Sequence, residues 1–530
     1  MSDAHGRTVA LWRIATWSVL LILTVAVALT FRDYGISHDE FVQHTYGRLL
    51  WDFYLSGFAD RAVFDYIDLY RYGGLFDLVA TAAARLLPFA EYDTRHLLSA
   101  LCGIVGIAGA GRLATLLAGP RAGFFAVALL ALTSSYYGSM FNNTKDIPFA
   151  AGMIWTLYYA VRVVTVLPKP GLALALKFGA AFGLTIGIRV GVMMIPVYLS
   201  VAIAIWAWDR VRREESGVVA VEVWRAALRL LPGAVLAYTI MAFAWPWAVV
   251  QPLNPLRALA FFSRHPAVLE SEIFGIDIVS SHTPWYYIPG YLLVKLPELT
   301  LILFAIGLAI FVTRIVRRTG IERAEAVLVT LAVLVPLILF VLFRPTVFNG
   351  MRHFFFLVPP MTVMAALAAD ELWRAFHARG RLWVGAFVVI LVGIGFMQAR
   401  TIAALHPNQY VYYNSIAGGV AGAQDRFEMD YWSNSIREVA MLLSDRVRSE
   451  AGESGPAKPY KVALCTEVFG FFHYVPDGWF VVADTWSEGE FFVAPTHMDC
   501  DRMLEGELIV VVERMGALLA VVKDRRRLVR

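Results

Sequence analysis

Apolar runs long enough to cross a bilayer recur along most of this chain, and they constrain its fold more than any other feature. A hydrocarbon core of about 30 Å needs about 20 consecutive apolar residues of helix. Only 17% of the 530 residues are charged, against about a quarter in soluble globular domains. The sequence predicts an all-α polytopic membrane bundle of about 11 transmembrane helices, at residues 9–31, 96–117, 122–139, 148–167, 172–188, 190–208, 229–250, 291–313, 325–343, 353–370 and 382–399.

Lysine and arginine are distributed unevenly between the loops that join these runs. They gather before the first run and after alternate runs, at Arg7, Arg13, Arg112, Arg121, Lys169, Lys177, Arg210, Arg212, Arg213, Arg314, Arg317, Arg318, Arg323, Arg374, Arg379 and Arg381. Because short cytoplasmic loops are enriched in these residues, the N-terminus is predicted to be cytoplasmic. An odd number of spans then places the C-terminal tail outside. We expect a multi-pass protein of the inner (plasma) membrane whose first run is retained, since no small-residue cleavage site follows it.

The composition changes after the last predicted span. Residues 1–399 are expected to form the membrane domain, with two long outward loops at 32–95 and 251–290. In the first loop, apolar and aromatic residues at helical spacing predict two helices, over 41–54 and 72–87, that lie in the interface plane or cover the bundle edge. Residues 400–530 predict a small extracytoplasmic α/β domain, with a helix over 433–449 and strands at 461–465, 479–483, 490–493 and 508–513.

Three cysteines are too few for a disulfide framework. Cys102 lies inside a predicted span and is expected to be a small packing residue. Cys465 and Cys500 both fall in the tail. Two buried thiols are the favoured interpretation of this pair, and a disulfide, which an oxidising compartment would permit, is the alternative.

Two adjacent acids, Asp39 and Glu40, follow the first predicted span by fewer than ten residues. Carboxylates at a membrane boundary are costly to desolvate and add nothing to a span, so their position indicates a chemical role. An external carboxylate can act as a general base for a hydroxyl acceptor, and an adjacent acid can raise its pKa. A solvated loop pair is the alternative, but the aromatic helical stretch that follows directly favours chemistry.

Two further outward segments carry charges at the membrane boundary. The first is a short loop with Asn142, Lys145 and Asp146, in which Lys145 supplies a point charge and Asp146 holds that charge or caps the next helix. The second presents Arg352 and His353 at the outer end of a span. A guanidinium there suits a lipid phosphate, and an arginine that snorkels to the headgroups is the common alternative.

Together these segments carry Asp-Glu in the first outward loop, Asn-x-x-Lys-Asp-x-Pro in the second, and Arg-His at a late span. With this combination, residues 8–400 resemble the GT-C glycosyltransferases, and more narrowly the family-39 group of protein O-mannosyltransferases and lipid A aminoarabinose transferases. The resemblance implies a GT-C-like enzyme of the cell envelope that transfers a sugar, with inversion, from a polyprenyl-phosphate donor. The acceptor would be a hydroxyl of a protein (protein O-glycosylation), of a lipid A-like lipid or of a glycan, on the outer face of the membrane.

The resemblance also implies roles for the matching residues. Asp39 would be the catalytic base that deprotonates the acceptor, and Glu40 would support or orient it. The donor phosphate would be bound by Lys145, Arg352 and His353, with Asp146 and Asn142 in supporting positions. No Cys/His cluster with metal-ligand spacing is visible in the sequence. Divalent metals are not general in the group that the chain resembles, so the resemblance implies no metal. We also expect no cofactor beyond the lipid-linked donor, and no nucleic-acid partner.

A transporter or flippase of lipid-linked sugars is the main alternative, and a membrane scaffold or sensor is a third class. Transporters place ionisable residues near the bilayer midplane and often contain inverted repeats. Here Arg189 is the conspicuous charge inside a predicted apolar stretch, no repeat is visible, and the other singled-out charges gather in outward loops. In the tail, residues 430–432 (Asp-Tyr-Trp) are expected to form a junction between tail and bundle, with contact to a sugar ring as the alternative.

Overall fold

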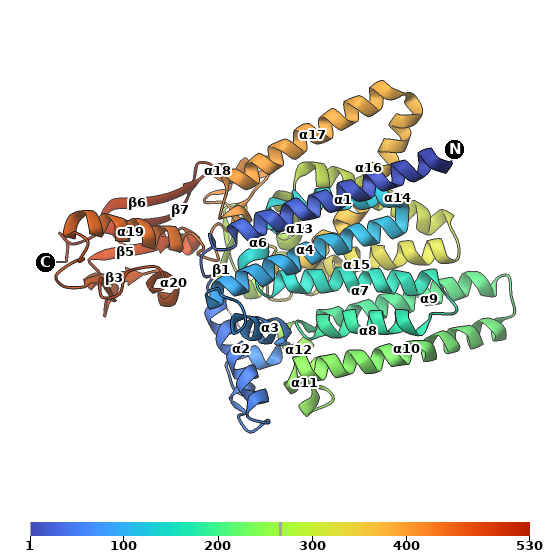
Figure 1. Ribbon diagram of the computed structural model, residues 1–530, viewed down its shortest axis with the longest axis horizontal. Coiled ribbons are helices and arrows are strands. Elements are labelled where there is room, and N and C mark those ends of the chain that lie inside the picture. Colours follow the sequence, from blue (N-terminus) through green and yellow to red (C-terminus); the bar gives the residue numbers. More distant parts are fainter. Residues whose placement is uncertain (1, 264–267, 530) are drawn as a thin grey trace.

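Long helices lie side by side through most of the molecule, and a small α/β domain extends the bundle at one end (Figure 1). This computed structural model describes residues 2–263 and 268–529. We call the end of the bundle that carries the α/β domain the domain end, and the opposite end, where the N-terminus lies, the far end. Residues 264–267 of the predicted outward loop 251–290 lie outside the described residues.

Within the described residues, nine helices are long and apolar enough to cross a membrane. They are α1 (Ser2–Thr30), α4 (Glu91–Ala118), α7 (Asp146–Thr165), α9 (Met194–Val211), α10 (Ser216–Ala244), α14 (Glu298–Arg317), α15 (Ile321–Phe343), α16 (Val358–Arg379) and α17 (Arg381–Ala404). A tenth span is possible if α5 (Pro120–Ala131) and α6 (Ser134–Asn142), which meet at 67°, are counted together.

The predicted span 172–188 instead forms α8 (Leu172–Ile186), which has 15 residues. At 1.5 Å per residue, α8 is about 22 Å long and falls short of a hydrocarbon core of about 30 Å. The helix ends early because the chain becomes extended at Arg189 (φ −146°, ψ 141°) before α9 begins. The prediction of eleven full-length spans is therefore corrected to nine, or ten with the bent pair, in the described part of the chain.

The predicted outward loop 32–95 folds into helices that lie across the domain end (Figure 1). They are α2 (Glu40–Leu55) and α3 (Leu75–Ala84), close to the predicted stretches. Gly47 of α2 touches the backbone of Asp77 in α3, so the two helices pack closely. The Tyr54 hydroxyl of α2 donates to the Phe243 carbonyl of α10. This pair of helices thus covers the edge of the bundle.

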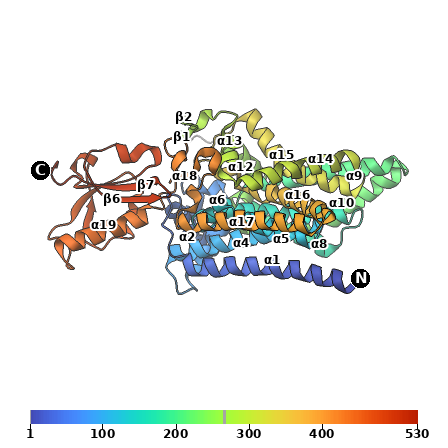
Figure 2. The ribbon, with the colours of Figure 1, turned by 90° about the horizontal axis from the view of Figure 1, so that it is seen from above.

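The short helix α11 (Pro246–Val250) directly precedes the predicted outward loop 251–290. The loop region carries α12 (Asn254–Phe262), the antiparallel hairpin of β1 (Glu270–Ile273) and β2 (Ile276–Val279), and α13 (Tyr287–Lys295), which extends beyond it. The sequence prediction contained no strand here. Figure 2 shows the hairpin at the domain end, on the side of the bundle opposite α1.

The C-terminal domain is a five-stranded sheet in the order β4-β3-β5-β7-β6. Its strands are β3 (Tyr460–Leu464), β4 (Phe480–Val482), β5 (Phe491–Pro495), β6 (Glu507–Arg514) and β7 (Ala517–Asp524). β3 pairs in parallel with β4 and β5, and β7 pairs antiparallel with β5 and β6. Helix α19 (Ile436–Ala451) packs against β5, β6 and β7. The four predicted strands and the helix are present, and β7 was not predicted.

A disulfide joins Cys465 and Cys500 within this domain. The favoured sequence interpretation, two buried thiols, is therefore wrong, and the alternative is correct. The bond ties the end of β3 to the short helical segment η9 (His497–Arg502). Cys102 in α4 is a free, half-buried cysteine, as expected.

Candidate functional site

A cavity of about 250 Å³ lies at the domain end of the bundle. Its polar wall is formed by Asp39, Tyr72, Lys145, Arg189, Arg352 and His353. The rest of the lining is mainly apolar and includes Phe149, Val190, Leu259, Phe262, Val347, Phe348, Phe354 and Phe356. Four of the predicted site residues, Asp39, Lys145, Arg352 and His353, therefore meet in one cavity, although they come from three distant segments.

Asp39 and Arg352 form an ion pair in this cavity, with 3.1 Å between Asp39 Oδ2 and Arg352 Nη1. The Asp39 side chain is 43% exposed and the Arg352 side chain only 7%. The guanidinium of Arg352 lies 4.6 Å from the ring centres of both Phe348 and Trp432. These two rings hold the guanidinium plane, and Nε of Arg352 has no hydrogen-bond partner among the described residues.

A second group of charges surrounds Tyr72. The Lys145 ammonium lies 3.9 Å from the centre of the Tyr72 ring, and the Arg189 guanidinium lies 5.7 Å from it. Arg189 pairs with Asp146 at 2.6 Å (Nη2 to Oδ1), and the other oxygen of Asp146 accepts a hydrogen bond from the Asn143 amide. Lys145 is the N-cap residue of α7 and Asp146 is its first residue, and the Asp146 carboxylate binds Arg189 and the Asn143 amide.

Glu40, the predicted partner of Asp39, does not line the cavity. Its side chain is fully buried and accepts hydrogen bonds from the Ser37 backbone N–H (2.8 Å) and from His96 Nε2 (3.2 Å). Asp39 precedes α2 and Glu40 is its first residue, and successive helical residues point about 100° apart. The two acids therefore face different surroundings, and Glu40 fixes the turn that carries Asp39.

Asn142 also lies outside the cavity. Its amide Nδ2 donates to Asn434 Oδ1 of the tail (3.1 Å), and its carbonyl accepts from the Ser37 hydroxyl (3.1 Å). In the tail, Asp430, Tyr431 and Trp432 are buried, and none of them lines the cavity. The junction interpretation of residues 430–432 agrees with this placement.

Burial and charge act in opposite directions on the acid in the cavity. Burial alone would raise the pKa of the Asp39 carboxyl, but the charges of Arg352 and Lys145 outweigh it and lower that pKa below its usual value. Burial lowers the pKa of the Lys145 ammonium to about 8, against the opposing effect of nearby carboxylates, Asp77 first. At neutral pH the cavity thus contains an ionised carboxylate and a lysine that loses its proton readily.

The sequence reasoning missed two cavity residues. Arg189 was noted as a charge inside an apolar stretch and was given no role, although an ionisable residue in such a position marks a functional site by default. Tyr72, which lies between Lys145 and Arg189, had no recognisable signal in the sequence. Among the described residues, no group of three or more His, Cys, Asp or Glu side chains is arranged to hold a metal ion.

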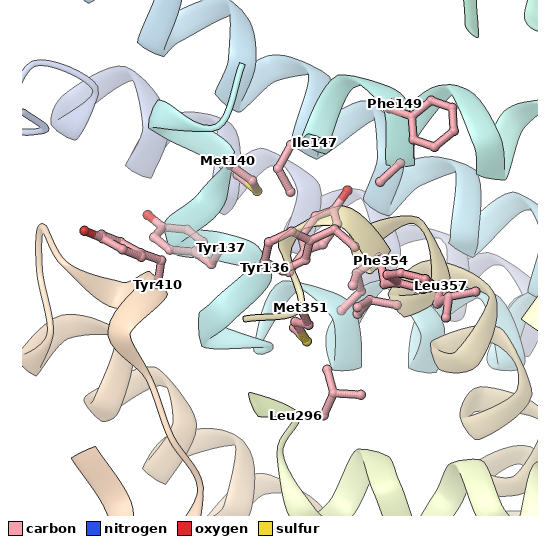
Figure 3. Close-up of a cluster of buried hydrophobic side chains, with 14 of the residues drawn as sticks. Tyr136, Tyr137, Met140, Ile147, Phe149, Leu296, Met351, Phe354, Leu357 and Tyr410 are labelled. Carbon is pink, nitrogen blue, oxygen red and sulfur yellow. The ribbon is translucent and has the colours of Figure 1, made fainter. Parts of the chain in front are cut away.

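The elements that supply the cavity residues pack together through a cluster of buried apolar side chains (Figure 3). Side chains of α6, α7, the segment η5 (Arg352–Leu357), the end of α13 and the tail meet there. Phe149 and Phe354 belong to both the cluster and the cavity lining. At Gly138 of α6 a Cβ would lie 2.2 Å from the backbone nitrogen of Tyr410, so helix and tail touch backbone to backbone.

Comparison with known proteins agrees with this architecture. Residues 76–246 match the family described as dolichyl-phosphate-mannose-protein mannosyltransferase. ArnT from Cupriavidus metallidurans, in a crystal structure bound to undecaprenyl phosphate, superimposes with a TM-score of 0.50 at 15% identity, over 96% of this chain and 98% of that one. The chain has the GT-C fold.

Other solved structures are similar to this chain at lower scores. ArnT in the apo state gives a TM-score of 0.47 at 16% identity, over 95% of this chain and 97% of that one. The Archaeoglobus fulgidus oligosaccharyltransferase gives 0.48 at 13% identity, over 91% of this chain and 69% of that one. Comparison with curated protein sequences gives no match.

Proposed function

We propose that this protein is a membrane glycosyltransferase that moves a sugar from a polyprenyl-phosphate donor to a hydroxyl acceptor on the outer face of the membrane. One observation carries the proposal: a single cavity at the domain end combines one ionised carboxylate, Asp39, with the three cations Lys145, Arg189 and Arg352 beside an apolar lining. A lipid-linked sugar phosphate is complementary to this cavity. Its phosphate suits the cations, its sugar suits the polar wall, and its lipid chain suits the apolar lining.

The chemistry assigned to these residues is a direct displacement. The acceptor hydroxyl gives its proton to Asp39 as its oxygen attacks the anomeric carbon, and the bond from that carbon to the phosphate oxygen breaks. The polyprenyl phosphate leaves with the bonding electrons, and the configuration at the anomeric carbon inverts. Lys145, Arg189 and Arg352 stabilise the negative charge that develops on the leaving phosphate.

The cations suit this task in different ways. Arg352 already binds Asp39 through Nη1, and its buried Nε has no hydrogen-bond partner among the described residues. Arg189 likewise has an Nε without a partner among the described residues. Guanidinium groups bind phosphate through two parallel hydrogen bonds, whereas Lys145 acts as a point charge. We therefore add Arg189 to the phosphate-binding residues proposed from the sequence, since it lines the same cavity as Lys145, Arg352 and His353.

The comparisons support the choice of donor. The matching family is named for a dolichyl-phosphate-linked sugar, and the crystallised ArnT holds undecaprenyl phosphate. Both are polyprenyl phosphates. The outer-face assignment is supported by the basic residues of the far end, for example Arg314, Arg317 and Arg323, because cytoplasmic loops are enriched in such residues.

The transporter alternative is less well supported. Arg189, the charge that could have marked a substrate site at the membrane midplane, lies in the same cavity at the domain end. Its partner Asp146 begins α7 and also belongs to that end. Arg189 and Asp146 therefore belong to the cavity at the domain end and do not mark a path through the bundle.

Loss and restoration of a glycan test the proposal. Cells of the source organism that lack the protein should lose one glycan, from a protein, a lipid A-like lipid or a polysaccharide, and the lost glycan identifies donor sugar and acceptor together. The unaltered gene should restore it, and Asp39→Asn should not. The purified protein should also bind undecaprenyl phosphate. Accumulation of a lipid-linked sugar on the inner leaflet, with transfer activity intact in broken membranes, would favour a flippase instead.

A further inference from the structure

The tail that follows the last span touches each of the three segments that build the cavity. Asn434 bonds the loops of Asp39 and of Lys145, and Trp432 lies on the guanidinium of Arg352. None of these contacts was foreseen from the sequence. They give the tail a direct connection to the site, although residues 430–435 do not line the cavity.

One oxygen atom joins the two loops. Asn434 Oδ1 accepts a hydrogen bond from the backbone N–H of Gly35 (2.7 Å) and a second from Nδ2 of Asn142 (3.1 Å). Gly35 precedes Asp39 by four residues, and Asn142 precedes Lys145 by three. We call these two hydrogen bonds the Asn434 bridge. Two more hydrogen bonds join the same parts of the chain. The Ser37 hydroxyl donates to the Asn142 carbonyl (3.1 Å), and the Thr144 hydroxyl donates to Gln43 Oε1 in α2.

The Asn434 amide is itself fixed. Its Nδ2 donates to the Pro407 carbonyl (3.2 Å) and to Asn408 Oδ1, and its backbone N–H donates to Asp430 Oδ1 (3.1 Å). The side chain is 1% exposed. Both amide protons and the oxygen are therefore used, and a flipped amide would place donors against donors on one side and acceptors against acceptors on the other.

The backbone also fits closely at this point. At Gly35 a Cβ would lie 2.5 Å from the Asn434 carbonyl oxygen, so only glycine allows the loop to approach. A segment pressed against a buried, fully bonded amide has little freedom to move. The tail thereby adds a constraint to the distance between the Asp39 loop and the Lys145 loop, beside the direct hydrogen bonds between them.

We infer that Asn434 is a positioning residue for transfer, which fixes the Asp39 loop relative to the Lys145 loop through the Asn434 bridge. This inference rests on the proposed function. Asp39 must reach the acceptor hydroxyl while Lys145 holds the donor phosphate, and a misplacement of about 1 Å can cost about 100-fold in rate. Loss of the bridge should therefore slow transfer far more than it weakens phosphate binding.

Asn414 offers a matched control. It is also a buried asparagine of the tail, 2% exposed, and its Nδ2 donates to the carbonyls of Leu293 (2.7 Å) and Leu296 (2.8 Å). It ties the tail to the bundle as Asn434 does, but the contacts of its side chain involve none of the three site segments. A purely structural role would make Asn434→Ala and Asn414→Ala equivalent.

The test measures two quantities per mole of folded full-length protein. One is the initial rate of sugar transfer in membranes of cells that lack the endogenous protein, and the other is the affinity for undecaprenyl phosphate. Asn434→Ala should lower the rate by about 10- to 100-fold and change the affinity by less than about threefold. Asn414→Ala should leave both near the values of the unaltered protein.

Asn142→Ala removes only one hydrogen bond of the Asn434 bridge. It provides a second test of the inference if Asn434→Ala does not fold. It should lower the rate by a smaller factor, and the double variant should be no slower than Asn434→Ala alone, because both act through one bond. Equal rates for Asn434→Ala and Asn414→Ala, or an Asn142→Ala rate equal to that of the unaltered protein, would overturn the inference. Absence of transfer by the unaltered protein would instead overturn the proposed function, and the inference with it.

Discussion

Asp39 and Arg352, which are 313 residues apart in the chain, are joined by a hydrogen-bonded ion pair of 3.1 Å. The pair links the proposed base to a proposed phosphate ligand. Burial raises the pKa of the Asp39 carboxyl, and among the charges that lower it below its usual value Arg352 has the largest effect, so the pair favours the ionised form. Under the proposed function, a donor phosphate and Asp39 share one guanidinium, so donor binding and the position of the base are coupled.

Replacement of Asp39 tests the base. Asp39→Asn keeps the size of the side chain and removes its ability to take a proton. General bases contribute about 10²- to 10⁴-fold to rate, so transfer should fall by that factor while undecaprenyl phosphate still binds. Asp33→Asn is the control, because Asp33 belongs to the same loop but bonds His406 outside the cavity. Near-normal transfer by Asp39→Asn would remove Asp39 from the mechanism.

Replacement of Arg352 tests the phosphate site. Arg352→Lys retains the positive charge but loses the planar fork and the contacts with Phe348 and Trp432. We expect affinity for undecaprenyl phosphate to fall by about tenfold or more, which equals about 1.4 kcal/mol. Arg344→Lys is the matched control, since Arg344 is exposed and does not line the cavity. Equal affinity of the two variants in a binding titration would contradict the assignment.

The pKa of Lys145 predicts a pH dependence of binding. Burial lowers this pKa to about 8, and only the protonated amine attracts a phosphate. Affinity for undecaprenyl phosphate should therefore be highest below pH 8 and fall above it, by at most about tenfold per pH unit. Lys145→Arg, whose guanidinium does not titrate in this range, should give a flat profile between pH 7.5 and 9.5. A decline of the same slope in Lys145→Arg would assign the titration to another group.

The helices and most strands could be predicted because their signals are local. Apolar runs identified the spans, and β-branched runs identified four strands of the C-terminal sheet. The prediction failed where local composition does not determine the length of a helix, as in α8, which ends at Ile186, before the extended residue Arg189. It also failed at Cys465 and Cys500, since the spacing of two cysteines does not show whether their sulfurs meet.

Several residues of the site could be predicted from the sequence, but the contacts between the segments that carry them could not. Asp39, Lys145 and Arg352 stood out because charges at a membrane boundary are costly. The different surroundings of Asp39 and Glu40 depend on where α2 begins, which sequence fixes only within a few residues. Asn434 lies 399 residues from Gly35 and 292 from Asn142, and no pattern in a single sequence reports a contact over that separation.

The disulfide should stabilise the C-terminal domain. Cys465 and Cys500 are separated by 35 residues, and loss of such a bond typically costs about 2–4 kcal/mol. Cys500→Ser should make the domain more sensitive to limited proteolysis in the full-length protein, because proteolysis follows the population of opened molecules. Cys102→Ser, at the free cysteine of α4, should leave the digestion rate of the domain unchanged. Equal rates for the two variants would show that the bond does not stabilise the domain.

The side of the membrane on which the cavity lies decides which substrates can reach it. Ser454 is exposed in the C-terminal domain, and Thr319 is exposed in the turn between α14 and α15 at the far end. In a Cys102→Ala background, an impermeant maleimide should label Ser454→Cys on cells whose plasma membrane is intact, and Thr319→Cys only after permeabilisation. The reverse pattern would place Asp39 and its neighbouring cations on the cytoplasmic face. Transfer to an outer-face acceptor would then be rejected, while the chemistry of the cavity would still stand.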